Sequence, residues 1–287
     1  MNAAELKGVS YVYSKNTPFM KVAVDNIDII FEENKITGLI GHTGSGKSTV
    51  AQMLNGLLRP SDGDVVIHGR NMWEDPKKIK EFRYMTGLVF QYPEYQLFEE
   101  TVYKDIAFGP KNMGLSDEEI DVRVREAAHF VGIPDDMLEK SPFDISGGQK
   151  RRVAIAGVMA MRPKNLVLDE PAAGLDPRGR DEILSKICAY QKETGSTVIM
   201  ISHSMEDMAL YCDKLVVMSH SKPIMTGTCA EVFSRADEIE TAGLAVPQVT
   251  KLMTELAKKG YDVNTSVYTV EEAKRELLRV LGGEKKC

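Results

Sequence analysis

The stretch that decides the fold reads Gly41-His42-Thr43-Gly44-Ser45-Gly46-Lys47-Ser48. It follows an apolar run at residues 36–40 and precedes a helical pattern at residues 48–58. Glycines let backbone N–H groups turn toward an anion, and a helix start adds the positive end of its dipole. We therefore expect Lys47 to reach the β- and γ-phosphates of a nucleotide and Ser48 to bind Mg²⁺. The alternative is a flexible loop that matches by chance, and the flanking strand and helix argue against it.

A second element supports this phosphate site from a distance. Residues 166–168 form an apolar run, which Asp169 and Glu170 follow directly. Chemistry on an α/β sheet takes place at the carboxyl ends of its strands. We expect Asp169 to hold Mg²⁺ through its water shell and Glu170 to orient or deprotonate an attacking water. Alone, an apolar run followed by two acids fits a solvated strand end equally well. The pattern supports a catalytic role only in combination with the phosphate loop.

A third element is the segment Ser146-Gly147-Gly148-Gln149, which opens a helical run at residues 150–161. Ser146 is a favourable N-cap, and the two glycines leave the helix start open to an anion. The chain thus carries two anion-binding helix starts. One γ-phosphate cannot easily contact both from distant parts of one chain, so we expect two chains to share each site.

The remaining pattern predicts an α/β fold with a helical appendage. Buried strands are expected at residues 36–40, 65–67, 88–90, 166–168, 198–201 and 215–218, with helices between several of them. Residues 92–161 show helical periodicity, clearest at 118–131, and are expected to form an inserted helical subdomain. We place the main domain at residues 1–235 and a C-terminal extension at 236–287.

The C-terminal extension is predicted to hold two short amphipathic helices. Pro247 opens the first, and Thr269 with Glu272 forms a capping box that opens the second. The apolar stripe of the first helix consists of Val249, Leu252, Met253 and Leu256. Two such helices cannot hide their stripes fully from each other. We expect them to pack on the main domain or on another subunit, and thus to support dimerisation.

Composition narrows the function classes. The 287 residues carry a net charge of −6. Proteins that bind nucleic acid usually show a basic surface, so the net charge gives no reason to expect a nucleic-acid partner. The four cysteines form no CxxC pair, so reduced thiols are expected rather than disulfides or a zinc site. Residues 1–9 lack the apolar core of a signal peptide, and no run approaches the ~20 apolar residues of a membrane-spanning helix.

Taken in this order, the three elements resemble those of an ATPase of the ABC family, and the resemblance covers residues 1–235. It implies a P-loop nucleotide-binding domain that holds ATP and Mg²⁺ between its own phosphate loop and the Ser-Gly-Gly-Gln segment of a second ATPase subunit. The resemblance also implies single-residue roles: adenine stacking for Tyr13, Mg²⁺ and water sensing for Gln91, a γ-phosphate contact for His203, and nucleotide contacts for Thr49 and Asp176. The last of these lies in a loop, residues 173–176, that signals across the dimer.

Further segments narrow the resemblance to the energy-coupling-factor importers of vitamins and metal ions, second ATPase type. They include Val89-Phe90-Gln91-Tyr92-Pro93-Glu94, Phe108-Gly109-Pro110 and Ser202-His203-Ser204-Met205-Glu206-Asp207. This implies a motor subunit at the cytoplasmic face of the cell membrane. Its partners would be an identical or sister ATPase, a transmembrane coupling component and a substrate-binding membrane subunit. Ile145, Asn165 and Ala172 depart from the family pattern but remove no catalytic atom, so hydrolysis is expected.

Residues 91–110 are expected to dock the membrane partner. Four acids, Glu94, Glu99, Glu100 and Asp105, alternate there with Tyr92, Tyr95, Leu97 and Phe98. That mixture suits a cytoplasmic helix with one apolar and one arginine-rich face. An ordinary solvated surface is the alternative for any single acid.

Two other functions remain open: a soluble ABC ATPase that acts on DNA or ribosomes, and the motor of a different ABC transporter class. The soluble relatives usually carry long coiled-coil insertions or two ATPase units. About 100 residues separate Lys47 from Ser146, with no heptad array between them. A phosphate-loop kinase or GTPase would leave the Ser-Gly-Gly-Gln helix start unexplained. The transported substrate does not follow from this chain, because that choice would lie in another protein.

Overall fold

The main sheet of the protein has six strands. In the computed structural model, which describes residues 1–283, their spatial order is β10 (Lys222–Thr228), β9 (Lys214–Ser219), β3 (Ile36–Gly41), β8 (Thr197–Ile201), β7 (Asn165–Asp169) and β6 (Thr86–Val89). Strands β9 to β6 are parallel, and β10 joins β9 antiparallel. The predicted α/β fold is confirmed, and the carboxyl ends of β3, β6, β7 and β8 meet at one edge.

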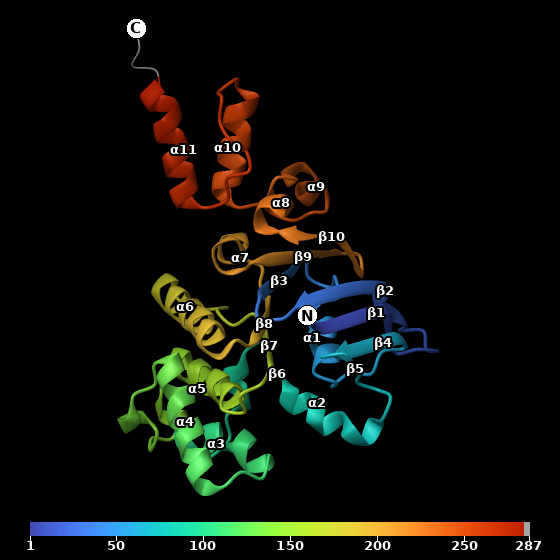
Figure 1. The fold of residues 1–287 in the computed structure, drawn as a ribbon, viewed down its shortest axis with the longest axis vertical. Coiled ribbons are helices and arrows are strands. Elements are labelled where there is room, and N and C mark those ends of the chain that lie inside the picture. Colours follow the sequence, from blue (N-terminus) through green and yellow to red (C-terminus); the bar gives the residue numbers. More distant parts are fainter. Residues whose placement is uncertain (284–287) are drawn as a thin grey trace.

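A second, antiparallel sheet lies beside the first (Figure 1). Its order is β2 (Lys21–Glu32), β1 (Asn2–Tyr13), β4 (Asp62–Ile67) and β5 (Arg70–Asn71). The strand expected at residues 65–67 belongs here, whereas β1 and β2 were not predicted. Their pairing shifts register repeatedly, for example between Leu6 and Val9. Such bulges break the period-2 alternation that marks a strand in a sequence.

Both faces of the six-stranded sheet are covered. Leu39 on β3 and Val167 on β7 face a core shared with the small sheet and with α1 (Lys47–Leu54). Ile40 and Leu168, one residue further along, face a second core shared with the helices of the other side, including α6 (Pro177–Thr194). Burial on both faces explains why these strands read as continuous apolar runs.

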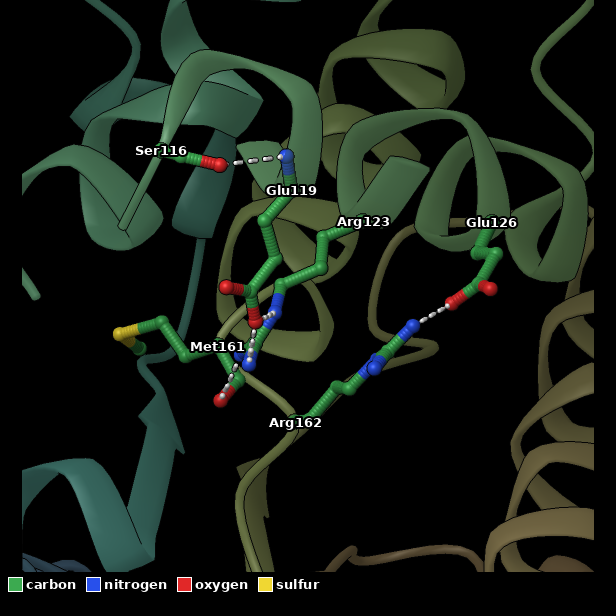
Figure 2. Close-up of polar contacts among 6 residues, drawn as sticks. All are labelled: Ser116, Glu119, Arg123, Glu126, Met161 and Arg162. Atoms are coloured by element: carbon green, nitrogen blue, oxygen red, sulfur yellow. Dashed lines mark hydrogen bonds and ion pairs between the residues drawn. The ribbon is translucent and has the colours of Figure 1, made fainter. Parts of the chain in front are cut away.

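Helices alone occupy the region between β6 and β7, at one end of the molecule (Figure 1). They are α3 (Val102–Asn112), α4 (Asp117–Val131) and α5 (Gly147–Met159), and the short α2 (Ile79–Met85) precedes β6. Figure 2 shows how α4 is tied to the segment that leads into β7: Arg123 donates to the Met161 carbonyl at 3.3 Å, and Arg162 pairs with Glu126. The helix expected at 118–131 is confirmed. The division into a domain and an inserted subdomain stays a prediction.

The C-terminal helices stand at the opposite end (Figure 1). After α7 (Met205–Tyr211), the chain forms α8 (Cys229–Phe233), α9 (Ala236–Thr241), α10 (Gln248–Lys258) and α11 (Val270–Gly283). The capping box is present, since the Glu272 N–H donates to the Thr269 hydroxyl and the Thr269 N–H to the Glu272 carboxylate. Within residues 1–283, no helix is long and apolar enough to cross a membrane.

The apolar stripe of α10 is divided between two environments. Met253 is fully buried in a small core with Val267 and Ala273, and Val249 and Leu256 pack against that core. Leu252 points outward with 48% of its surface exposed, and Leu278 and Leu281 on α11 are more exposed still. The extension therefore hides part of its apolar surface within the chain and leaves part of it uncovered. Cys287 lies outside the described residues.

Candidate active site

The phosphate loop connects β3 to α1 as the sequence predicts. Gly44 and Gly46 adopt left-handed conformations, with φ of +83° and +105°. A Cβ on Gly46 would stand 2.4 Å from the Ala23 carbonyl oxygen, and one on Gly41 would stand 2.4 Å from that of Met218. Because the loop packs this closely on β2 and β9, only glycine fits at these two positions. The result is a narrow cradle at the start of a helix.

Two buried polar groups in this cradle fit a bound phosphate. The Lys47 ammonium, 6% exposed, donates to the carbonyls of Gly41 at 2.7 Å and His42 at 3.0 Å. Burial lowers the pKa of Lys47, while the nearby carboxylates of Glu170 and Asp169 raise it. The Ser45 hydroxyl is fully buried with no hydrogen-bond partner among the described residues. A buried cation and an orphaned hydroxyl are the groups that an anionic phosphate would satisfy.

The two carboxylates at the end of β7 face the loop. Asp169 and Glu170 are 8% and 9% exposed. Burial raises the pKa of Asp169, although a hydrogen bond from Ser48 and the charge of Lys47 act in the opposite direction. Ser48 and Asp169 are therefore neighbours, as a shared Mg²⁺ would require.

Glu170 has the more strongly perturbed carboxyl group. Burial, with the charge of Asp169 as the second cause, raises the pKa of Glu170 to about 7. Its backbone is left-handed at φ 55°, and its N–H donates to the Ile201 carbonyl at 3.0 Å. Strain of this kind is typical of functional positions. Its Oε1 lies 3.3 Å from Nε2 of His203. Burial and the charge of Lys47 together lower the pKa of His203.

A cavity of about 230 Å³ brings most of the predicted site together. Its lining includes Tyr13, Thr43, Gly44, Gly46, Lys47, Ser48, Thr49, Gln91, Asp169, Glu170 and His203. The Tyr13 hydroxyl lies 3.2 Å from that of Thr49, and the edge of the Tyr11 ring contacts Tyr13. The His42 side chain does not line the cavity. It contacts the Thr43 carbonyl and the ring of His220 instead.

The Ser-Gly-Gly-Gln segment lies outside this cavity. Ser146 caps α5 in a full capping box with Gln149. A Cβ on Gly147 would meet nothing within 4 Å, so the helix start is open. A second cavity, of about 480 Å³, holds Ser146, Gly148 and Gln149 together with Asp176. Within one chain the structure does not join the two sets of predicted nucleotide contacts.

Comparisons with known proteins fit this geometry. The family model described as "ABC transporter" matches residues 24–173. The chain is also 53% identical to the energy-coupling factor transporter ATP-binding protein EcfA2 of Clostridium acetobutylicum. The match covers 98% of this chain and 99% of that protein. The chain belongs to the ABC transporter family. The EcfA2 protein of Caldanaerobacter subterraneus is 52% identical, with 98% of each chain covered.

A solved structure agrees with the ABC assignment. CbiO1 from Clostridium perfringens, described as part of the ABC transporter complex CbiONQ, matches with a TM-score of 0.75 and 38% identity, over 88% of this chain and 99% of that one. As an ABC protein the chain binds nucleotide and is an ATPase. None of these three relatives favours the alternative of a soluble ATPase acting on DNA or ribosomes.

Sequence reasoning missed three features of this ABC domain. Lys21 and Ala23 on β2 also line the cavity of about 230 Å³ that holds the predicted nucleotide contacts, here called the nucleotide cavity. Glu94, one of the four acids expected to dock the membrane partner, pairs within the chain with the buried Arg151 at 2.9 Å. Asn165, a departure from the family pattern, is fully buried and donates to the Thr86 hydroxyl while His68 contacts its oxygen. The pairing of Glu94 with Arg151 leaves no local signal in the sequence, because 57 residues separate them.

Proposed function

We propose that this chain is the ATP-hydrolysing motor of an energy-coupling-factor importer and works as one half of an ATPase dimer at the cytoplasmic face of the membrane. The observation that carries the proposal is the split between the two cavities. The phosphate loop and both carboxylates share one cavity, while Ser146 opens onto another. A second ATPase chain, identical or sister, would supply the missing half of each site. The EcfA2 relatives, named as transporter subunits, indicate the type of importer.

The residues support hydrolysis through positioning and charge. Lys47 would exchange its two carbonyl partners for the β- and γ-phosphates, and Tyr13 would stack on adenine. Ser48, Asp169 and Gln91 would hold Mg²⁺, which when bound neutralises charge on the phosphates. Glu170 would accept the proton of the attacking water, and its raised pKa suits a base that works near neutral pH. His203 would hold the γ-phosphate from the adjacent strand end.

Docking of the membrane partner is proposed for a groove of about 800 Å³ between α2, α3 and α5. The rings of Phe98 and Phe108 meet edge to face in its wall, with centroids 5.0 Å apart. Asp105 lines it as well, and its Oδ2 is buried without a hydrogen-bond partner among the described residues. Burial is the main cause that raises the pKa of Asp105. An arginine on an apolar helix would satisfy this carboxylate, whereas Glu94 and Glu100 already have partners in Arg151 and Lys104.

Purification of the tagged chain from detergent-solubilised host membranes tests the proposal. We expect integral membrane proteins and a second ATPase to co-purify in fixed stoichiometry, and the complex to hydrolyse ATP. A Lys47→Ala chain should assemble equally and lose hydrolysis. Recovery of the chain only from the soluble fraction, bound to DNA or ribosomes, would refute the transporter assignment.

A further inference from the structure

Lys21, which was not among the expected nucleotide contacts, lines the nucleotide cavity. Lys21 is the first residue of β2 and lies directly across the antiparallel pair from Tyr13. It lines the nucleotide cavity together with Tyr13 and Gly44. The hairpin between β1 and β2 therefore brings a cation and an aromatic ring to the same side of the site.

The charge of Lys21 has no counter-charge within the described chain. Two lysines of the six-stranded sheet form ion pairs with acids of β2: Lys222 with Asp25 at 2.9 Å, and Lys214 with Glu32. Lys21 is exposed and forms no ion pair in the part of the chain that the structure describes, residues 1–283. An unpaired cation at the mouth of a site for a polyanion is available to the ligand.

The position of the ammonium group relates it to the phosphate loop. Lys21 Nζ lies 4.0 Å from the point that a Cβ on Gly44 would occupy, and Gly44 has no side chain to intervene. Lys47 donates to the carbonyls of Gly41 and His42 in the same loop. Both lysines line the one cavity, each beside a different residue of the phosphate loop.

We infer that Lys21 is a nucleotide-binding residue that pairs with the phosphates nearest the ribose. The inference rests on the proposed function, because it takes Tyr13 as the adenine contact. A nucleotide that runs from Tyr13 to Glu170 must pass its first phosphates beside Lys21 and present its last phosphate at the far end. Lys21 therefore stabilises ATP and ADP alike.

Nucleotide titrations of three variants test this inference. Coulomb attraction at 4 Å is worth about 1 kcal/mol in water, and somewhat more where solvent is partly excluded. Lys21→Met should therefore raise the dissociation constants of ADP and of ATP by the same factor, about fivefold to tenfold. Lys21→Arg should bind like the parent, and so should Lys15→Met, which removes an exposed lysine from the same hairpin. Added salt should weaken binding by the parent more than by Lys21→Met.

Three results would overturn the inference. They are unchanged affinity in Lys21→Met, an equal loss of affinity in Lys15→Met, and a loss of affinity confined to ATP. Lys47→Ala separates this failure from that of the proposed function. If Lys47→Ala abolishes ATP binding while Lys21→Met does not weaken it, only the role of Lys21 is wrong. If Lys47→Ala binds ATP like the parent, the assignment of the nucleotide site itself is wrong.

Discussion

Glu170 Oε1 and His203 Nε2 lie 3.3 Å apart at the ends of adjacent parallel strands. That oxygen of Glu170 is buried and has no hydrogen-bond partner among the residues that the structure describes. A buried acceptor without a partner is costly unless water or a ligand reaches it. The proposed attacking water would satisfy this oxygen, next to the His203 imidazole that follows the neighbouring strand.

Replacement of Glu170 by Gln tests its role as the base. The amide keeps the shape of the side chain but cannot accept the proton of the attacking water. Turnover in the assembled complex should fall by about 10²–10⁴-fold, the usual scale for lost acid–base help, while ATP binding remains. A variant that hydrolyses ATP at the parent rate would show that another group performs this step.

The same carboxyl group predicts the pH dependence of turnover. Burial raises the pKa of Glu170 to about 7, and only the ionised form can accept a proton. The ionised fraction falls as the pH drops through 7, so the rate of the parent should fall on the acid side of neutrality. The Glu170→Gln variant has no group to titrate at this position, and its residual rate should lack this acid limb. A parent profile that stays flat from pH 8 down to about pH 5.5 would contradict the prediction.

The separation of Ser146 from the nucleotide cavity predicts complementation between chains. In a self-paired dimer, a Lys47→Ala chain keeps its Ser146 segment, and a Ser146→Arg chain keeps its phosphate loop. Each mixed dimer then contains one intact composite site, so hydrolysis should appear in the mixture and be absent from either variant alone. Full activity of one variant by itself would mean that a single chain completes the site. For a sister-chain pair, both substitutions in one chain should abolish hydrolysis at both sites, whereas the same two substitutions split between the two chains should leave one site intact.

The sequence predicted the strands and loops at the carboxyl edge of the six-stranded sheet better than it predicted the small sheet. The phosphate loop and the end of β7 carry local signals, because each places its functional residues directly beside a strand or helix. The β1–β2 hairpin carries none, since its bulges disrupt the alternation. Lys21 was missed for this reason, as its place opposite Tyr13 depends on that register. The pairing of Glu94 with Arg151 joins two distant segments and is visible only in three dimensions.

The divided stripe of α10 predicts different effects for neighbouring residues. Leu252 is 48% exposed, whereas Met253 is fully buried in the core between α10 and α11. Leu252→Lys should weaken dimer association without loss of fold, and sedimentation of the purified chain measures this. Met253→Ala should instead destabilise the fold by about 2–5 kcal/mol, as is typical of a buried methionine. Unchanged association of Leu252→Lys would mean that the exposed part of the stripe has no partner in the dimer.

Asp105 is predicted to be the acid that the membrane partner contacts. Its Oδ1 accepts the backbone N–H groups of Phe98 and Glu99, at 3.2 and 3.3 Å, so the carboxyl group is fixed while Oδ2 remains unpaired in the groove. Asp105→Asn keeps an oxygen for those two N–H groups but removes the charge. If a partner arginine pairs with Asp105, loss of the charge leaves that arginine buried without a counter-charge, at a cost of about 2 kcal/mol or more, or roughly thirtyfold in affinity. Co-purification with the membrane component should therefore fall sharply, while ATP binding by the isolated chain remains.

Glu100→Gln is the matched control, because that exposed acid already pairs with Lys104 and its replacement should not affect assembly. If Asp105→Asn assembles and supports uptake like the parent, the partner docks elsewhere.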